Sequence, residues 1–349
     1  DQTPDLNAIF ITKFALEQSQ KMTAENILES LNIKINPHNP VDFSVATTTD
    51  ETADGLFSMP DDYGTSYYYR GAASNNYVKF GKNAEGQDMW WRIIRFNGNG
   101  SMRIIYDGAS TSDSESYTKD FALSNQPWNA NDDDAKYTGW MFGGKQGEPS
   151  TSKEEAQRNE TSTNVKVAVD AWYKSNIVDT GYHDYVSDEI FCNDRSFDEK
   201  KGTGYGNSNT YFKGRTRLVS DINPQLTCPQ ENDKFTVEEI SGGNGALTYP
   251  VGLITADEIM VAGSGKYDNY DNYDTAINFY LKRNKFSWTF TPSHFSESGG
   301  FAFIIQNYLY SRLISVSTVG VLPVINIKSE LVHQLQGNGT IDNPYVLQG

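Results

Sequence analysis

The feature that most constrains the fold of this chain is a pair of apolar runs, residues 89–96 and 102–106, that flank Asn97-Gly98-Asn99-Gly100. Asn and Gly tolerate the positive φ angles that tight turns between antiparallel strands require. Both runs are rich in the aromatic and β-branched side chains that favour strands. The sequence therefore predicts a β-hairpin here, and short aromatic runs at residues 67–70 and 77–80 predict further strands.

Fold class follows from composition and from the spacing of the strand signals. Of 349 residues, 13% are aromatic and 29 are Gly, so the chain is poor in helix formers and punctuated by turns. We expect an α+β fold with long loops and a few helices around short antiparallel sheets. A run rich in Pro and Thr at residues 36–54 predicts a boundary near residue 50. This divides the chain into an N-terminal helical segment with its linker, residues 1–50, and a main domain, residues 51–349.

The N-terminal segment has a helical pattern. Apolar residues from Leu6 to Leu31 are spaced by three and four, which predicts an amphipathic helix, and Thr23 could cap a second helical piece. Such a segment either packs on the main body or drives assembly into a homo-oligomer or a pilus. We expect packing.

The rest of the chain carries few helical signals. A helix is expected from Thr163, and a short one over residues 185–191. Residues 247–255 predict a strand that runs into a helix, where Thr255 and Glu258 form a capping box. The polar tract between residues 107 and 164 predicts long surface loops.

Charge and hydropathy restrict the partners. The formal net charge of -16 argues against nucleic acid and anionic membrane, because like charges repel. There is no run of about eighteen apolar residues, so no membrane insertion is expected within this sequence. The chain begins at Asp1, which suggests that a signal or an anchor was removed. Cys192 and Cys228 could form a disulfide or remain free thiols, and the polar, Tyr-rich composition favours the disulfide and an extracellular setting.

Sequence patterns of enzymes and metal sites fit poorly. The chain lacks a Gly-x-Ser-x-Gly elbow, a phosphate-binding loop and a His-Glu-x-x-His motif, and its four His are not at ligand spacing from one another. We therefore expect no enzyme, no cofactor and no transition metal. Two acidic clusters, Asn131-Asp132-Asp133-Asp134 and residues 267–274, offer the oxygen atoms that Ca²⁺ prefers, although solvated loops are the commoner explanation.

The most informative stretch for function is residues 288–327. A Thr-Pro turn follows Trp288, and a β-branched run at residues 319–327 closes the stretch as a buried strand. Between them, large rings mix with small hydroxyls and no helical period fits. That mixture is typical of a recognition surface, because rings give contact area at low entropy cost and small polar groups adapt their hydrogen bonds. The alternative is a pair of ordinary strands and loops over a core. The candidate ligand-binding residues are Phe286, Ser287, Ser293, His294, Ser296, Phe301, Phe303, Ile305, Asn307, Tyr308, Tyr310, Arg312 and Ser315.

Several longer motifs resemble a known family. They are Gly55-Leu56-Phe57, residues 61–71, Trp91-Arg92-Ile93-Ile94-Arg95, Phe191-Cys192-Asn193-Asp194-Arg195-Ser196, residues 247–258 and residues 339–345. Over residues 52–349 the chain resembles a family of surface proteins from gut Firmicutes. Their main domain is similar to the C-type-lectin-like fold of the formylglycine-generating-enzyme type, so the resemblance implies that fold here.

That fold also resembles the variable proteins of diversity-generating retroelements, which display a mutated stretch near the C-terminus on a fixed scaffold. The resemblance places residues 288–325 at that stretch and makes residues 320–325 its invariant closing strand. Two positions depart from the family pattern: Leu322 replaces an Arg, which removes a buried polar anchor, and Phe290-Thr291-Pro292 replaces Leu-Ser-Pro. Cys192 and Cys228 match the family's own two cysteines rather than the copper-binding pair of the oxidase branch, which argues against an enzyme.

These observations lead to one hypothesis and two alternatives. We expect an extracellular or surface-displayed ligand-binding protein, adhesin-like or pilus-associated, that binds a protein or a glycan on another cell through its C-terminal aromatic surface. The first alternative is an enzyme on the same fold that uses acidic residues or a metal. The second is a structural subunit that assembles through the N-terminal helix.

Overall fold

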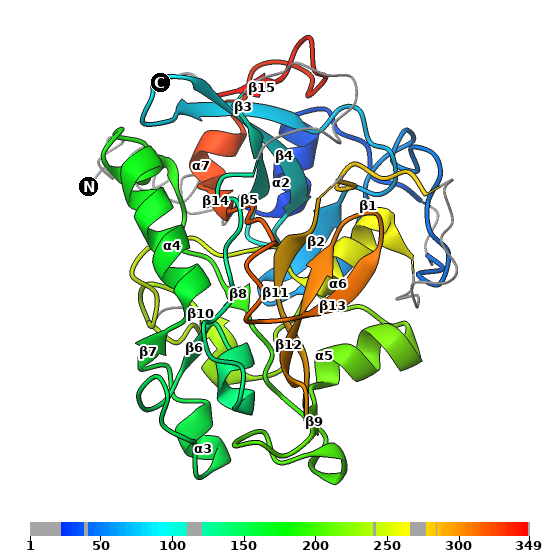
Figure 1. Cartoon of the computed structure of the whole chain (residues 1–349). Coiled ribbons are helices and arrows are strands. Elements are labelled where there is room, and N and C mark those ends of the chain that lie inside the picture. The colour runs from blue at the N-terminus through cyan, green and yellow to red at the C-terminus, as the bar shows by residue number, and fades with distance from the viewer. Residues whose placement is uncertain are drawn as a thin grey trace, which may run out of the picture.

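The computed structural model of the protein, shown in Figure 1, describes residues 22–37, 41–109, 121–239, 242–265, 277–283 and 285–347. Most of its regular structure lies in strands, and its helices are short. This mixture agrees with the α+β class expected from the sequence. Among the described residues, no helix combines the length and the apolar character needed to span a membrane.

The larger sheet has seven strands and is built around the predicted hairpin. The hairpin strands β4 (Asp88–Phe96) and β5 (Met102–Gly108) pair antiparallel, so this prediction is confirmed. One edge of β4 is shared by two strands at its two ends, and β5 continues the sheet on the other side. The remaining strands are β1 (Phe57–Asp61), β2 (Gly64–Tyr68), β3 (Tyr77–Lys82), β14 (Val324–Ile327) and β15 (Tyr345–Val346).

The second sheet contains the stretch that the sequence analysis singled out. Its four antiparallel strands lie in the order β13 (Leu309–Leu313), β12 (Gly299–Ile305), β11 (Ser287–Ser296) and β9 (Thr210–Tyr211). The alternative interpretation of this stretch was a pair of ordinary strands and loops over a core. Its backbone does form such strands. Two small two-stranded sheets complete the strands: β8 (Phe191–Cys192) with β10 (Lys234–Phe235), and β6 (Met141–Phe142) with β7 (Thr161–Ser162).

Helices lie around the two sheets (Figure 1). The α-helices are α2 (Ala24–Ser30), α3 (Lys153–Ala156), α4 (Asn164–Tyr173), α5 (Lys213–Arg215), α6 (Ala256–Ile259) and α7 (Ser329–Val332). Short 3-10 or π turns are η2 (Ala135–Thr138), η3 (Lys174–Val178), η4 (His183–Tyr185), η5 (Glu199–Lys201), η6 (Thr216–Asp221), η7 (Glu231–Asp233) and η8 (Met260–Ser264).

The described part of the N-terminal segment packs on the main body. Thr23 caps α2 through a capping box with Asn26, as a cap at Thr23 was predicted. Ile27 and Leu28 are buried in the core that the main sheet contributes to, and Ile27 lies against Gly100 of the hairpin turn. The earlier part of the predicted helix, Leu6 to Leu16, lies outside the described residues.

Two predicted elements are confirmed by their caps and packing. Helix α4 begins after Thr163 and buries one face, and its Trp172 packs edge-on against Trp91 and Tyr106 of the main sheet. Helix α6 begins at the predicted capping box, in which the Thr255 hydroxyl accepts from the Glu258 amide and the Glu258 carboxylate accepts from the Thr255 amide.

Three local predictions are wrong. Residues 185–191 form no helix, because the amide of Ile190 donates to the Tyr63 hydroxyl and the Asp188 carboxylate accepts amides from Val237 and Glu238. In residues 247–255 only Gly252 is in a β-bridge, to Val324.

The third wrong prediction concerns residues 107–164, whose described part is more than surface loop. It contributes Trp128 and Trp140 to the core, and neither side chain is exposed. Trp128 packs edge-on against Trp140 and against Trp288 of β11. The polar composition of this tract predicted surface loops. Two large buried rings are nevertheless enough to hold a polar loop against the core.

The two cysteines form a disulfide. Cys192 at the end of β8 is bonded to Cys228, and their Cα atoms are 5.5 Å apart. The bridge closes the loop of residues 193–227 at its base. This settles the choice between a disulfide and two free thiols.

Candidate functional site

Other elements cover much of the second sheet, so it presents only some of the predicted ligand-binding residues to solvent. Phe301, Phe303 and Ile305 share one face of β12 by strand alternation, yet only Phe301 is partly exposed. The expected exposure is wrong for five residues, which are all at most 5% exposed: Ser287, Ser293, Phe303, Ile305 and Tyr308. Phe303 and Ile305 belong to the core, and α6 packs against their strand. In this arrangement these five side chains present almost no surface to a ligand.

The row of rings that remains partly exposed crosses three strands. Tyr211 of β9 and Phe301 of β12 are both paired with His294 of β11. The His294 ring lies 5.7 Å from the Tyr211 ring and 4.4 Å from the Phe301 ring, with interplanar angles of 13° and 8°. Tyr211 is 42% exposed, and the other two are half-buried. We call Tyr211, His294 and Phe301 the ring ladder; since its rings stack face to face, it presents ring edges outward.

Polar contacts engage one ring nitrogen of His294, the middle ring of the ladder. Arg215 Nη1 donates to Ser293 Oγ over 3.2 Å, and Ser293 Oγ lies 3.1 Å from His294 Nδ1. The buried Ser293 hydroxyl thus accepts from Arg215 and also engages His294 Nδ1, where either group can be the donor.

Burial and charge keep that imidazole neutral. Burial, and next the positive charge of Arg215, lower the pKa of His294 to about 4. At neutral pH the ring is therefore uncharged, and its Nε2 has no hydrogen-bond partner among the described residues.

A groove adjoins the ring ladder. It has a volume of about 640 Å³, and its lining includes three cations and no carboxylate: Lys200, Lys201, Gly202, Asn209, Tyr211, Arg215, Thr216, Val219 and Ser220. We call it the cationic groove. It shares Tyr211 with the ring ladder, so a ligand in the groove would also contact the end of the ladder.

Glycines bring the walls of the groove together. A Cβ on Gly202 would lie 2.4 Å from the carbonyl oxygen of Asn209, so only Gly lets these two parts of the loop approach. A Cβ on Gly214 would lie 2.9 Å from Thr291 Cγ2 of β11. The close approach of α5 to β11 places Arg215 beside Ser293.

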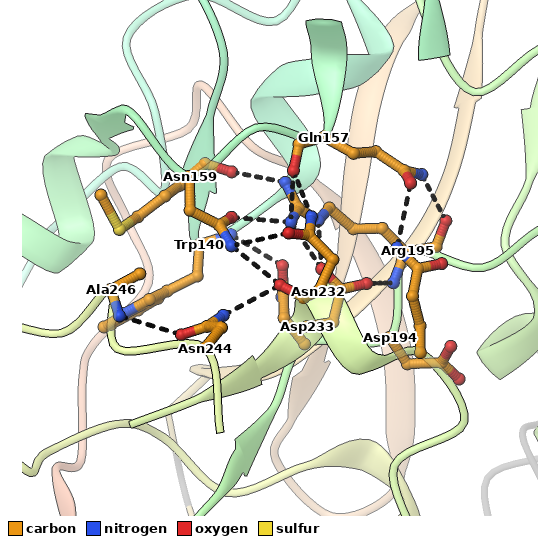
Figure 2. A network of polar contacts seen from close by, with 12 residues as sticks. Trp140, Gln157, Asn159, Asp194, Arg195, Asn232, Asp233, Asn244 and Ala246 are labelled. Atoms are coloured by element: carbon orange, nitrogen blue, oxygen red, sulfur yellow. Dashed lines mark hydrogen bonds and ion pairs between the residues drawn. The ribbon is translucent and has the colours of Figure 1, made fainter. Parts of the chain in front are cut away.

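A buried ion pair anchors the start of the loop that carries the groove. Arg195 is 1% exposed, and its Nε donates to Asp233 Oδ1 over 2.7 Å. Figure 2 shows the same guanidinium donating to the Gln157 carbonyl and to Asn159 Oδ1. These contacts occupy the guanidinium, so we assign Arg195 a structural role.

A second ion-pair cluster anchors the end of the loop. Arg217 donates from Nη1 to Asp194 over 2.9 Å and from Nε to Asp257 over 2.7 Å. Burial opposes its charged form, but the carboxylates of Asp257 and Asp194 outweigh that cost and raise the pKa of Arg217. Its charge is thus compensated inside the protein and adds little to the groove.

The other partly exposed candidates form a cluster near the edge strand β13. The Phe286 and Tyr310 rings are 5.8 Å apart at 87°, and the guanidinium carbon of exposed Arg312 lies 5.5 Å from the Phe286 centroid. Arg312 and Tyr310 point to the opposite face of β13 from Leu313, which pairs with Phe301 of the ladder. We call Phe286, Tyr310 and Arg312 the edge cluster, and the structure separates it from the ring ladder.

The remaining predicted residues lie in turns. Ser296 is half-buried at the end of β11, and Asn307 is half-buried between β12 and β13. Ser315 is also half-buried, and its hydroxyl donates to the carboxylate of Asp132. The structure thus disperses these three around the rim of the second sheet.

The acidic side chains proposed for calcium are engaged in the loop's own hydrogen bonds. The Asp134 carboxylate accepts from the Lys136 amide at the start of η2 and from Ser150, and Asp132 accepts from Ser315. In the part of the chain that the structure describes, there is no cluster of three or more His, Cys, Asp or Glu side chains arranged for a metal. The second acidic cluster, residues 267–274, lies outside the described residues.

Sequence reasoning missed the groove and Tyr211. The signal that could have found them is charge: residues 200–217 contain five Lys or Arg and no Asp or Glu, in a chain whose net charge is -16. No spacing rule places Tyr211 beside His294, because the pairing of β9 with β11 joins distant segments.

Comparison of the chain with protein-family models, with curated proteins and with solved structures finds no match.

Two features of the described surface are partly exposed, are held in place by their neighbours and carry groups that can pair with a ligand. One is the ring ladder with its relay from Arg215 to His294, and the other is the cationic groove that joins it at Tyr211.

Proposed function

We propose that this chain is an extracellular or surface-displayed ligand-binding protein whose ligand contacts the ring ladder. The observation that carries the proposal is the stack of Tyr211, His294 and Phe301, held parallel across three strands yet partly open to solvent. Aromatic side chains that are fixed before binding supply contact area with little loss of conformational entropy. The half-buried rings can still lose exposed apolar area when a ligand covers them.

We further propose that the scaffold is C-type-lectin-like and that its variable positions lie on the surface of the second sheet. The resemblance to variable proteins suggests residues 288–325, and the partly exposed members of that stretch suit a changing contact surface. They are His294, Ser296, Phe301, Asn307, Tyr310, Arg312 and Ser315. Buried members such as Phe303 would then support the sheet and vary less, because core substitutions cost stability. In this proposal the target is a protein or a glycan on another cell.

The disulfide supports the extracellular part of the proposal. Disulfides persist in oxidising compartments and are rare in the cytosol. The bond between Cys192 and Cys228 closes the loop that carries the cationic groove, so it also restrains the ligand site.

The test is binding of the full chain to arrays of immobilised glycans and extracellular proteins. The variant His294→Ser/Phe301→Ser should lose at least about tenfold in affinity for whatever the wild type binds, because clustered aromatic contacts dominate binding energy. Its melting temperature should fall by only a few degrees, since both rings are half-buried. The matched control is Val167→Ser on α4, where an apolar side chain is 58% exposed.

Equal binding by the wild type and the ladder variant would contradict the proposal. A collapse of the melting temperature in the ladder variant would instead identify these rings as core, and the ladder could not then be the binding surface.

A further inference from the structure

We propose that the ligand of this site is an anionic glycan, one that carries carboxylate or sulfate groups. The inference rests on the proposed function, because it takes the ring ladder as the binding surface. It adds that the cationic groove beside Tyr211 receives the charged sugar.

Charge is the first observation behind this inference. The protein has a net charge of -16, yet the groove lining holds Lys200, Lys201 and Arg215 without any carboxylate. Lys200 and Lys201 are exposed, and neither is in an ion pair among the described residues. The nearest acidic side chains in sequence are Asp198 and Glu199; Asp198 accepts the Lys200 amide. These two exposed lysines, Lys200 and Lys201, attract an anion at short range.

The ring ladder adds further groups that attract an anion. Aromatic rings carry partial positive charge at their edges, and the ladder presents edges outward. The uncharged His294 ring has its Nδ1 engaged by Ser293, which leaves Nε2 to pair with a ligand. A ligand that spans the groove and the ladder therefore meets positive charge, ring edges and an imidazole nitrogen.

The size and lining of the groove favour a glycan over other anions. Its volume of about 640 Å³ falls within the range of roughly 300–1,000 Å³ that small-ligand sites occupy. Asn209, Thr216 and Ser220 offer polar side chains that can pair with sugar hydroxyls. Nucleic acid carries a charge at every phosphate and would be repelled by the acidic remainder of the protein. A glycan with isolated charges places its anion in the groove and its neutral rings elsewhere.

The experiment compares neutral, carboxylated and sulfated glycans on one array, followed by titration of the best binder and its uncharged counterpart. The charged glycan should bind at least about tenfold more tightly than the neutral one. The variant Lys200→Gln/Lys201→Gln should remove most of that preference. Raising NaCl from about 50 to about 500 mM should weaken wild-type binding more than binding by this variant, because salt screens exposed charges.

The matched control is Lys34→Gln/Lys145→Gln, which removes the same charge from exposed positions that do not line the groove. It should change affinity less than about twofold. The carboxylated and sulfated arms distinguish the two sources of the anion.

Three outcomes would overturn the inference while leaving the proposed function intact: binding to neutral glycans only, binding to poly-glutamate as strong as to charged glycans, or binding to proteins alone. Loss of binding in the lysine control to the same extent as in the groove variant would also overturn it, because the effect would then come from net charge. A ladder variant that binds as the wild type does would instead contradict the proposed function.

Discussion

His294 shows at the scale of one residue how neighbours set chemistry. Its type and position suggested a contact residue, and its environment keeps its ring uncharged. Burial and Arg215 lower its pKa to about 4, while Ser293 engages its Nδ1. Neither effect is visible in the local sequence, because Arg215 comes from a distant segment.

The shifted pKa predicts how stability depends on pH. The folded pKa of His294 is about 4, below the ordinary value of about 6.5, so protonation favours the unfolded chain. The stabilisation from the neutral His294 ring is complete above about pH 6.5. It is lost progressively as the pH falls from there to about 4. Between these values the wild type should lose up to about 3 kcal/mol more unfolding free energy than His294→Gln, measured by denaturant titration.

The control for this prediction is His333→Gln, since the His333 side chain is exposed. Its pH dependence should follow that of the wild type. Identical curves for the wild type and His294→Gln would mean that the His294 ring is solvated.

Helix α2 is an element whose amphipathic pattern left two roles open. Its apolar residues Ala24, Ile27 and Leu28 are all buried in the protein's own core, so in this structure they are not available to a second copy. The described part of the N-terminal segment therefore contributes to the fold. Assembly through residues 1–21 lies outside the described residues.

Substitution of Leu28 separates the two roles of α2. Leu28→Ala should lower the free energy of unfolding by about 2–5 kcal/mol, because it leaves a cavity in a packed core. Sedimentation should show the same oligomeric state as in the wild type. Glu29→Ala on the exposed side of α2 should change stability by less than about 0.5 kcal/mol. A folded Leu28→Ala protein with a changed oligomeric state would contradict this view.

The whole molecule is held together by links between distant segments. The disulfide joins β8 to Cys228, and buried ion pairs tie Arg195 to Asp233 and Arg217 to Asp257. All three lie at the ends of the loop that carries the cationic groove. The scaffold therefore restrains a long loop, which gives that loop a defined surface.

Removal of the disulfide tests this organisation. Cys192→Ser/Cys228→Ser should lose about 3–4 kcal/mol of unfolding free energy, because the bridge spans a separation of 36 residues and restricts the unfolded chain. Reduction of the wild type should produce a similar loss, and the double variant should not respond to reductant. A wild type whose stability is unchanged after both thiols are shown to be free would contradict the prediction.

The sequence located two residues of the candidate site, His294 and Phe301, but neither Tyr211 nor the cationic groove. The mixture of rings and hydroxyls pointed to residues 286–318, and His294 and Phe301 do lie on an open row. Phe303 and Ile305 have the same character and are buried, since elements from elsewhere in the chain cover that end of the sheet. Side-chain type alone does not distinguish the two cases.

The sequence by itself determined the features that depend on adjacent residues: the turn at Asn97-Gly98-Asn99-Gly100, the caps at Thr23 and Thr255, and the apolar face of α4. Only the tertiary structure decided which rings stay open and which cations gather. Tyr211 contacts His294 through strand pairing, and the fold of the loop brings Lys200 and Arg215 to the lining of one groove. Burial and electrostatic environment are properties of that packing, so local sequence patterns do not determine them.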